Sequence, residues 1–431
     1  MFSHYLDLAW RSIRKTPMMS LLMVFAISIG IGITIMTLNV HQLMANNPAG
    51  DRSDKLYSVN LWSQGPDSWD EFAVNLSFQD VMNLRKSDAA PRKAAMIATG
   101  MALTSTNPEV EPKLEHVRAT DRDFFAMFSV PFLFGGPWEA GADSEPARVV
   151  VIGKTINDAL FQGKNSVGEV VYLDNKPFRV VGVIDDWRVL PKFYDLHNGP
   201  TNDTEKLFIP FSLVEQEKYD PWGNVSGWKY EDGDLFNTEK VWIQFWAELN
   251  TPAELENYRN FLDGYVDSQQ QLGRFTDMSR SSWVRLNDVA HHLKDNKVVP
   301  EDNQILIGLS LLFLLVCLVN ILGLMLSKFL KRAPEVGVRR AIGASKRQIF
   351  AQHLVEVGLV GMLGGCFGLL WAWGALHYLA SRFALDDALT RLDPSIWFIA
   401  PGIAIGSAIL AGMYPAWVIC KTKPSVYLKS Q

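Results

Sequence analysis

Residues 305–327 read ILIGLSLLFLLVCLVNILGLMLS, and residues 332–350 read RAPEVGVRRAIGASKRQIF. The first stretch has no charged side chain, and it matches the roughly 20 apolar residues that an α-helix needs to cross a bilayer. The second stretch is short and strongly basic. An apolar helix that leads directly into a basic loop is typical of a membrane span that ends at the cytoplasmic surface. These two stretches therefore predict an integral membrane protein.

Three other segments have the same apolar character, and together with Ile305–Ser327 they make four predicted spans: Met18–Val40, Leu354–Ala380 and Pro394–Cys420. A lysine or aspartate at the centre of a membrane helix costs roughly 2.5–3.5 kcal/mol on insertion. The four segments avoid this cost, because their one formally charged residue is Glu356, near the start of the third span. The first run exceeds the roughly 7–15 apolar residues of a signal peptide core, so we interpret it as a retained anchor.

The orientation of the spans is predicted by the lysine and arginine residues that flank them. Only Arg382 and Arg391 lie between the third and fourth spans. Thirteen cations lie on the opposite side: Arg11, Arg14, Lys15, Lys328, Lys331, Arg332, Arg339, Arg340, Lys346, Arg347, Lys421, Lys423 and Lys429. We therefore expect both termini and the loop between the second and third spans to be cytoplasmic.

The predicted organisation is a membrane protein with four α-helical spans and a large α+β extracytoplasmic domain between the first two. Its parts are a cytoplasmic amphipathic N-terminus (1–17), transmembrane helix 1 (18–42), the outer domain (46–303), transmembrane helix 2 (304–327), a cytoplasmic loop (328–353), transmembrane helix 3 (354–380), transmembrane helix 4 (394–420) and a cytoplasmic tail (421–431).

The outer domain alternates strand-like and helix-like patterns. The predicted strands are 55–62, 93–103, 148–152, 169–173, 178–184 and 240–249, and the predicted helices are 77–86, 153–161 and 252–268. We also expect Asn287–Asn303 to form a helical stalk that continues into the second span.

The basic loop has the pattern of a short amphipathic helix. Pro334 and Glu335 suit a helix start, Val338 and Ile342 form a small apolar face, and Gly343 ends the helix. One interpretation is a basic helix that lies on anionic lipid. The other is a helix that sits in a groove of a cytoplasmic protein. Composition alone leaves both open.

Two further features lie inside the third predicted span. Small residues recur with helical spacing, which lets two helices approach closely, within one protomer or between two: Gly361, Gly364, Gly365 and Gly368. Glu356 is an acid within a membrane segment, so it is a candidate functional group. Its position near the cytoplasmic interface equally allows its carboxylate to reach the lipid headgroups.

Several classes of function have no support in the sequence. The formal net charge of −5 does not favour nucleic-acid binding. The three cysteines, Cys317, Cys366 and Cys420, all lie in or beside apolar runs, so we expect no disulfide in the outer domain. We predict no catalytic residue, metal site or bound cofactor in this chain, because no Ser/His/Asp, Cys/His or paired-carboxylate pattern stands out.

The loop 335–344, EVGVRRAIGA, resembles the E-[IV]-G-[IV]-[RK]-[RK]-A-[LI]-G-A signature of the MacB/FtsX-like permease family of ABC transporters. Both chain ends add to this resemblance, since 9–17 (AWRSIRKTP) and 414–417 (YPAW) are similar to the family's entry into its first span and to its C-terminal pattern. The run Val149–Ile184 is similar to the family's periplasmic core domain.

The resemblance implies that the loop holds a coupling helix that docks on an ABC ATPase. The docking residues would be Glu335, Gly337, Arg339, Arg340 and Gly343. It also implies two ATPase subunits that carry ATP and Mg²⁺, and a second permease chain, identical or paralogous. A periplasmic adaptor and an outer-membrane duct are further partners known in the family. Because Met1 lies only about 17 residues before the first span, we expect the ATPase to be a separate polypeptide.

Two functions follow from the resemblance as expectations. The first is a bacterial inner-membrane permease that exports or extracts peptide, lipid or antibiotic-like cargo by transmitting movement to its periplasmic domain. The alternative is a transducer without transport, which controls a cell-wall hydrolase or another periplasmic partner. The family's periplasmic region often has an inserted lobe, which we expect at about 120–205.

Overall fold

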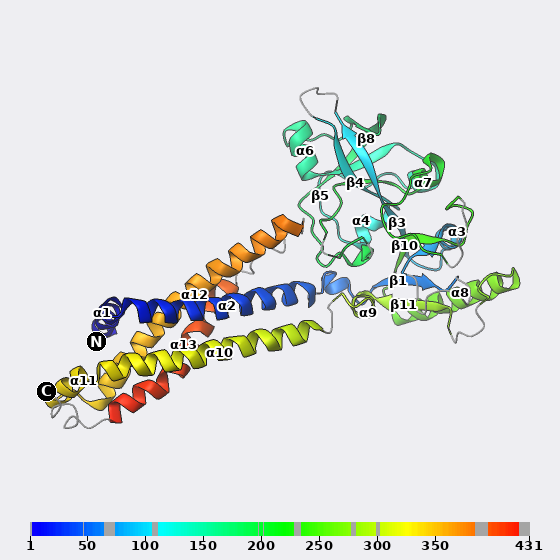
Figure 1. Ribbon diagram of the computed structural model, residues 1–431. Coiled ribbons are helices and arrows are strands. Elements are labelled where there is room, and N and C mark those ends of the chain that lie inside the picture. Colours follow the sequence, from blue (N-terminus) through cyan, green and yellow to red (C-terminus); the bar gives the residue numbers. More distant parts are fainter. Residues whose placement is uncertain are drawn as a thin grey trace. The chain divides into compact units, whose positions relative to one another are not determined.

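A computed structural model covers residues 1–431 and describes residues 2–45, 47–63, 74–105, 111–196, 198–200, 202–227, 234–276, 282–298, 302–383 and 395–421. The chain divides into two compact units. The helical unit comprises Met1–Ala45 and Val299–Gln431, and the sheet domain comprises Asn46–Val298 (Figure 1).

The described part of the helical unit consists of four long helices and two shorter ones: α1 (Phe2–Lys15), α2 (Pro17–Ala45), α10 (Asp302–Lys331), α11 (Ala333–Ala341), α12 (Lys346–Phe383) and α13 (Ile396–Lys421). The long helices α2, α10, α12 and α13 are apolar enough to cross a membrane. The helices α2, α10 and α12 contain the first three predicted spans and extend beyond them at both ends. The helix α13 begins at Ile396, whereas the fourth predicted span starts at Pro394, which lies outside the described residues. Polar residues such as Lys328 and Lys346 can join these helices because backbone hydrogen bonding continues past the apolar windows.

Packing in the helical unit is tightest where small and branched apolar side chains meet. Ile27 and Ile31 of α2 and Ala404 of α13 are fully buried, and α12 packs against both of these helices. Large apolar side chains point outward instead, such as Leu309 of α10 and Phe398 of α13, which is 83% exposed. An apolar exterior around a small-residue interior is the arrangement expected of helices that pack in lipid.

The sheet domain is built on one mixed sheet of eleven strands within the described residues. The strands are β1 (Leu56–Leu61), β2 (Leu76–Ser77), β3 (Arg92–Thr104), β4 (Lys113–Thr120), β5 (Phe132–Gly135), β6 (Val149–Gly153), β7 (Val170–Leu173), β8 (Lys176–Ile184), β9 (Leu207–Pro210), β10 (Val241–Glu248) and β11 (Val284–Asp288). Its helices are α3 (Phe78–Lys86), α4 (Asp123–Met127), α5 (Gly141–Ser144), α6 (Lys154–Phe161), α7 (Ser212–Glu217), α8 (Pro252–Gln271) and α9 (Val289–Asp295), with 3₁₀ turns at Gly50–Arg52 and Phe193–Asp195.

The strand order is β11-β1-β10-β3-β4-β9-β6-β8-β5, with β2 paired to β10 and β7 paired to β3 and β8. The first and last strands of the domain, β1 and β11, are antiparallel neighbours, with Tyr57 opposite Asp288. The strand β10 is buried along its whole length, and six of its eight residues (VWIQFWAE) are apolar, as expected of a strand that is covered on both faces. Pairs β4–β9 and β6–β8 are parallel, and the chain between each pair includes a helix.

A buried charged cluster lies near the middle of this sheet. Arg118 of β4 is fully buried and pairs with Asp195 and Glu205. Lys192 and Tyr194 also contact Glu205, at 3.1 and 2.9 Å. Burial alone would raise the pKa of Glu205, but the charges of Arg118 and Lys192 outweigh it and hold this pKa well below its usual range. The cluster ties the segment before β9 to the centre of the sheet.

The predicted fold class is confirmed: four apolar spans accompany an α+β domain. The longer predicted strands and helices of this domain coincide with β1, β3, β6, β7, β8, β10, α3, α6 and α8 to within a few residues. The predicted helical stalk over 287–303 is wrong at its start and is interrupted after Asp295, and its residues 299–301 lie outside the described residues. Asn287 and Asp288 belong to β11, and the helix α9 ends at Asp295, because Lys297 adopts a positive φ of 49°. The inserted lobe at about 120–205 stays a prediction.

Candidate functional site

The predicted coupling loop forms the helix α11 and a sharp turn after it. Pro334 lies in the first turn, where its missing N–H removes no helical hydrogen bond. Gly343 has a φ of +110°, a conformation that favours glycine, and it ends this helix. Ser345 then caps α12 by accepting a hydrogen bond from the Gln348 amide at 3.2 Å. The helices α11 and α12 are therefore joined by a short, ordered turn rather than by a flexible linker.

One face of α11 is buried and the other is exposed. Ala333, Val336 and Gly337 form the buried face. Val338 and Ile342 point outward and are 47% and 83% exposed. Within the described residues, the predicted apolar face therefore stays largely exposed.

The two predicted docking arginines have partners within the chain. Arg339 donates to Glu335 at 2.7 Å and to Gln352 of α12 at 3.2 Å. Arg340 donates to the carbonyl oxygen of Cys420 in α13, at 3.3 Å. Both guanidinium groups therefore help to fix α11 against the bundle, in addition to any contact with a partner protein.

A groove of about 660 Å³ runs beside the exposed face of α11. Tyr5 and Leu8 of α1 line one side, and Ile342, Gln348 and Gln352 are among the residues of the other. The groove thus lies between the amphipathic N-terminal helix α1 and the segment that contains α11.

Glu356 lies at the centre of a buried polar cluster and does not reach the surface. It is 2% exposed, and its Oε1 atom lies 2.7 Å from Nζ of Lys328, which is 1% exposed. The hydroxyl of Ser12 also donates to this carboxylate, and Lys328 donates to the hydroxyl of Ser20 at 3.1 Å. Side chains of α1 and α10 therefore contact this carboxylate of α12 directly, and Ser20 of α2 joins the cluster through Lys328.

The same cluster extends to the N-terminal end of α11. Arg332, the residue before α11, donates to the backbone oxygen of Ser12 at 3.1 Å and lies 4.0 Å from Glu356. His353 of α12 places its ring 4.2 Å from that of Phe329. A buried ion pair is held in place by its geometry, because separating the charges leaves each one desolvated. The cluster therefore fixes α11 to three membrane helices and to α1.

The four predicted glycines of α12 face two different helices of the same chain. A Cβ atom at Gly361 or Gly365 would lie 2.7–2.8 Å from Ala408 or Ala404 of α13. A Cβ atom at Gly364 or Gly368 would lie 2.5–3.0 Å from Ile27 or Ile31 of α2. The stripe thus lets α12 pack closely against α13 on one side and α2 on the other.

We expect Gly365→Val to destabilise the helical unit by roughly 1–3 kcal/mol, because the added methyl groups overlap with Ala404 and Pro401 of α13. Thermal unfolding of the detergent-solubilised chain measures this loss. Gly374→Val in the same helix is the matched control, since nothing lies within 4 Å of a Cβ atom there. Equal melting temperatures for the two variants would contradict the close packing of α12 and α13.

The sequence pointed to Glu356 but not to its partners. Lys328 counts in the sequence only as a flanking cation, although it is the residue that neutralises Glu356. A detectable signal exists: the two residues lie at the facing ends of consecutive antiparallel spans, so they come to the same depth. Ser12 carries no comparable signal, because a serine in an amphipathic helix is usually a surface residue.

Comparison with known proteins identifies two matching families. Residues 20–260 match the MacB-like periplasmic core domain, and residues 307–424 match the FtsX-like permease C-terminal region. The first match covers more than half of the chain and includes the sheet domain up to α8. The second covers α10 to α13, and with them the coupling loop and Glu356.

Among curated relatives, macrolide export ATP-binding/permease protein MacB of Syntrophobacter fumaroxidans is 26% identical over 66% of this chain and 43% of its own length. The protein of that name from Escherichia coli K12 is 22% identical over 85% of this chain and 52% of its own length. The chain thus spans about half the length of the curated relatives it matches. The periplasmic region of MacB from Actinobacillus actinomycetemcomitans is 13% identical, with a TM-score of 0.37, over 59% of this chain and 97% of that structure.

Proposed function

Because this chain belongs to the permease family that combines a MacB-like periplasmic core domain with an FtsX-like C-terminal region, we propose that it is the permease part of an ATP-driven transport complex. In this proposal α11 docks on an ABC ATPase, two such ATPases bind ATP and Mg²⁺, and two permease chains work side by side. The relatives named above are ATP-binding/permease proteins, and this chain matches their permease portion.

The observation that carries the proposal is the divided surface of α11. Its buried face and its two arginines are held by the bundle, whereas Val338 and Ile342 are exposed, and Ile342 lines a groove of about 660 Å³. Apolar side chains anchored on a short, rigid helix are a recurring means of docking in a partner's groove. A helix that only lay on lipid would not require its N-terminal end to be held by the buried charges of the Glu356 cluster.

In this proposal the Glu356 cluster is the path along which movement is coupled. Movement of α11 displaces Arg332 and Lys328, and these residues contact Ser12 of α1 and Ser20 of α2. Because separating the buried charges is unfavourable, the helices are expected to move together rather than slide past Glu356. The family's mode of action, in which ATPase closure is passed on to the periplasmic domain, would use α2 and α10, since these helices connect directly to that domain in sequence.

The proposed orientation follows from the distribution of cations. Both termini and α11 face the cytoplasm of a bacterial inner membrane, and the sheet domain lies in the periplasm. Peptide, lipid or antibiotic-like molecules are the proposed cargo, received from or delivered to the periplasm. An adaptor protein and an outer-membrane duct would then receive the cargo.

Co-purification tests this proposal. The tagged chain is expressed with the ABC ATPase encoded nearest to its gene, and the recovered complex is assayed for ATP hydrolysis in lipid nanodiscs. We expect a stable complex whose ATPase rate differs from that of the ATPase alone. If no candidate ATPase binds the chain in detergent or in nanodiscs, the proposal is wrong.

A second measurement separates transport from transduction. The complex is reconstituted into vesicles, and ATP-dependent movement or release of candidate cargo is followed. Transport supports the proposal, whereas an active ATPase together with ATP-dependent activation of a bound cell-wall hydrolase would assign the chain to the transducers.

A further inference from the structure

A second cavity lies entirely within the sheet domain. It has a volume of about 860 Å³, within the range of roughly 300–1,000 Å³ that is usual for sites of small ligands. Its walls come from α3 and the start of β3 on one side, and from the segments around α4, α5 and α7 on the other. We call this cavity the α3–α7 cleft.

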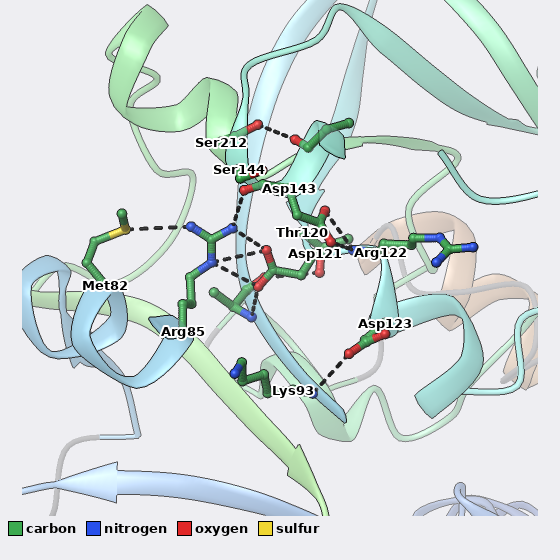
Figure 2. Close-up of polar contacts among 12 residues, drawn as sticks. Met82, Arg85, Lys93, Thr120, Asp121, Arg122, Asp123, Asp143, Ser144 and Ser212 are labelled. Atoms are coloured by element: carbon green, nitrogen blue, oxygen red, sulfur yellow. Dashed lines mark hydrogen bonds and ion pairs between the residues drawn. The ribbon is translucent and has the colours of Figure 1, made fainter. Parts of the chain in front are cut away.

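The floor of the α3–α7 cleft is apolar and carries one fixed cation. Phe78, Met82 and Phe211 line it, and the guanidinium group of Arg85 lies 4.9 Å from the centre of the Phe211 ring. Nε of Arg85 lies 3.1 Å from Oδ2 of Asp121, which is buried. Figure 2 shows this pair at the centre of the polar contacts.

Arg85 has one donor that remains available to a ligand. Its Nη2 atom donates to Asp121 and to the carbonyl oxygen of Asp143, the latter at 2.9 Å. Among the contacts of the described residues, its Nη1 atom donates only to the sulfur of Met82, at 3.6 Å (Figure 2). A thioether is a weak acceptor. The guanidinium group of Arg85 is therefore already oriented, and its Nη1 atom can donate to the oxygen of an incoming carboxylate.

Lys93 of β3 adds a second donor to the α3–α7 cleft. Its ammonium group donates to the backbone oxygen of Ser87. This contact uses one of the three N–H groups of the ammonium. Burial lowers the pKa of Lys93, although nearby aspartates oppose this effect. An incoming anion would therefore be stabilised more strongly here than at a fully solvated lysine.

The α3–α7 cleft is lined by equal numbers of cations (Arg85, Lys86, Lys93 and Lys218) and acids (Asp121, Asp123, Asp143 and Glu215). Most oxygens of the three aspartates have partners. Asp143 accepts from Nε1 of Trp138 at 2.9 Å and from the Arg122 amide at 3.0 Å. Burial, together with the charge of Asp121, raises the pKa of Asp143 to about 6. Burial also raises the pKa of Asp123, whose Oδ2 atom receives only a long contact of 3.4 Å from the Lys93 amide. The remaining oxygen of Asp123 is the acceptor that a ligand N–H would meet.

We propose that the α3–α7 cleft binds the carboxylate of a peptide. The carboxylate accepts from Nη1 of Arg85 and from the ammonium of Lys93, a peptide N–H donates to Asp123, and an apolar side chain of the peptide contacts Met82 and Phe211. A dianionic phosphate fits less well, because three aspartates line the same cleft. The carboxylate can be the end of the chain or an acidic side chain, since both offer the same acceptor geometry.

The test uses three fluorescein-labelled peptides with the full chain in detergent micelles. The first peptide, Gly-Ser-Gly-Ser-Ala-Leu-Phe, has a free C-terminal carboxyl group. The second is its C-terminal amide, and the third is the amide with Leu replaced by Glu. We expect fluorescence anisotropy to show binding of the first peptide and roughly tenfold weaker binding of the second, since hydrogen bonds to a charged group are the stronger kind. Binding of the third would identify an acidic side chain as sufficient, and its failure would identify the chain end.

Lys93→Gln provides the protein side of the test. It should weaken binding of the free-carboxyl peptide several-fold while leaving the amide unchanged, and Lys93→Arg should restore binding. A merely structural role would affect both peptides alike. Lys113→Gln is the matched control, because Lys113 lies on β4, is 72% exposed in its side chain and is paired with Glu115 outside the cleft.

Three results would overturn the proposal. These are equal affinity for the free-carboxyl peptide and its amide, no binding of either carboxylate peptide at millimolar concentration, and displacement of the peptide by an equal concentration of inorganic phosphate. None of these results depends on an ATPase, so failure here is distinct from failure of the proposed coupling.

Discussion

Glu356→Gln should destabilise the helical unit by roughly 3–5 kcal/mol. This is the usual effect of removing one partner from a buried ion pair. Lys328 is 1% exposed, and among the described contacts Glu356→Gln leaves its ammonium with neutral acceptors alone, the hydroxyl of Ser20 and the new amide oxygen, and without its counter-charge. The effect is expected to be larger than that of any surface substitution, since those usually stay within about 0.5 kcal/mol.

The cysteines provide the measurement for this prediction. Cys317 and Cys420 are buried free thiols of the helical unit, and Cys366 is exposed. With Cys366→Ala as the background, the reaction of a fluorogenic maleimide during heating reports the opening of this unit alone. Glu356→Gln should react at a clearly lower temperature than the background protein.

Two control variants make the result specific. Asp7→Asn removes the exposed pair with Arg11, at 2.9 Å, and should leave the transition unchanged. Lys328→Met combined with Glu356→Met removes both charges, and it should recover most of the stability, because an apolar replacement of a buried pair is often neutral. If the double variant is as unstable as Glu356→Gln, the ion pair is not the source of the effect.

Ile342→Asp should abolish the productive contact with the ATPase while leaving the chain folded. Ile342 is 83% exposed, so the change removes no internal packing. A central apolar anchor of an interface commonly contributes 2 kcal/mol or more, and a buried unpaired carboxylate adds a further penalty. We therefore expect at least a tenfold loss of affinity for the ATPase and a similar loss of the chain's effect on ATP hydrolysis.

The control for this variant is Leu114→Asp, an equally drastic change at a residue of the sheet domain that is 61% exposed. It should bind the ATPase normally. An Ile342→Asp chain that retains full affinity would show that α11 is not the docking helix, and the alternative of a basic helix on anionic lipid would then apply. Arg340→Glu is a less clear test, because Arg340 also contacts Cys420 of α13.

The spans, the longer strands and the coupling helix could be predicted because each has a local pattern. The strand β10 is rich in apolar and aromatic residues, and α11 begins at Ala333, with Pro334 in its first turn, and ends before Gly343. The strands β4, β9 and β11 have no such pattern. Their sequences are short or rich in charge, and pairing with distant residues decides their conformation, as Val117 opposite Leu207 illustrates.

The same distinction explains the candidate site. Glu356 was detectable because an acid in an apolar span is unusual. Its contact with Ser12 joins residues 344 positions apart in the chain, and no local pattern carries such information. The α3–α7 cleft was missed for the same reason, since Arg85, Asp121 and Asp143 come from separate elements and meet only in the folded sheet domain.

The pairing of β1 with β11 bears on how such proteins diversify. The chain leaves the helical unit after α2 and returns to it at α10, and these two helices pack against each other. The first and last strands of the sheet domain are also neighbours. A domain whose first and last residues lie close together can be replaced by another domain without a change in the path of the flanking helices. Replacement of residues 46–298 by a short linker should therefore preserve the packing of the four long helices. In the same way, different outer domains can be inserted at this point during evolution while the helical unit is retained.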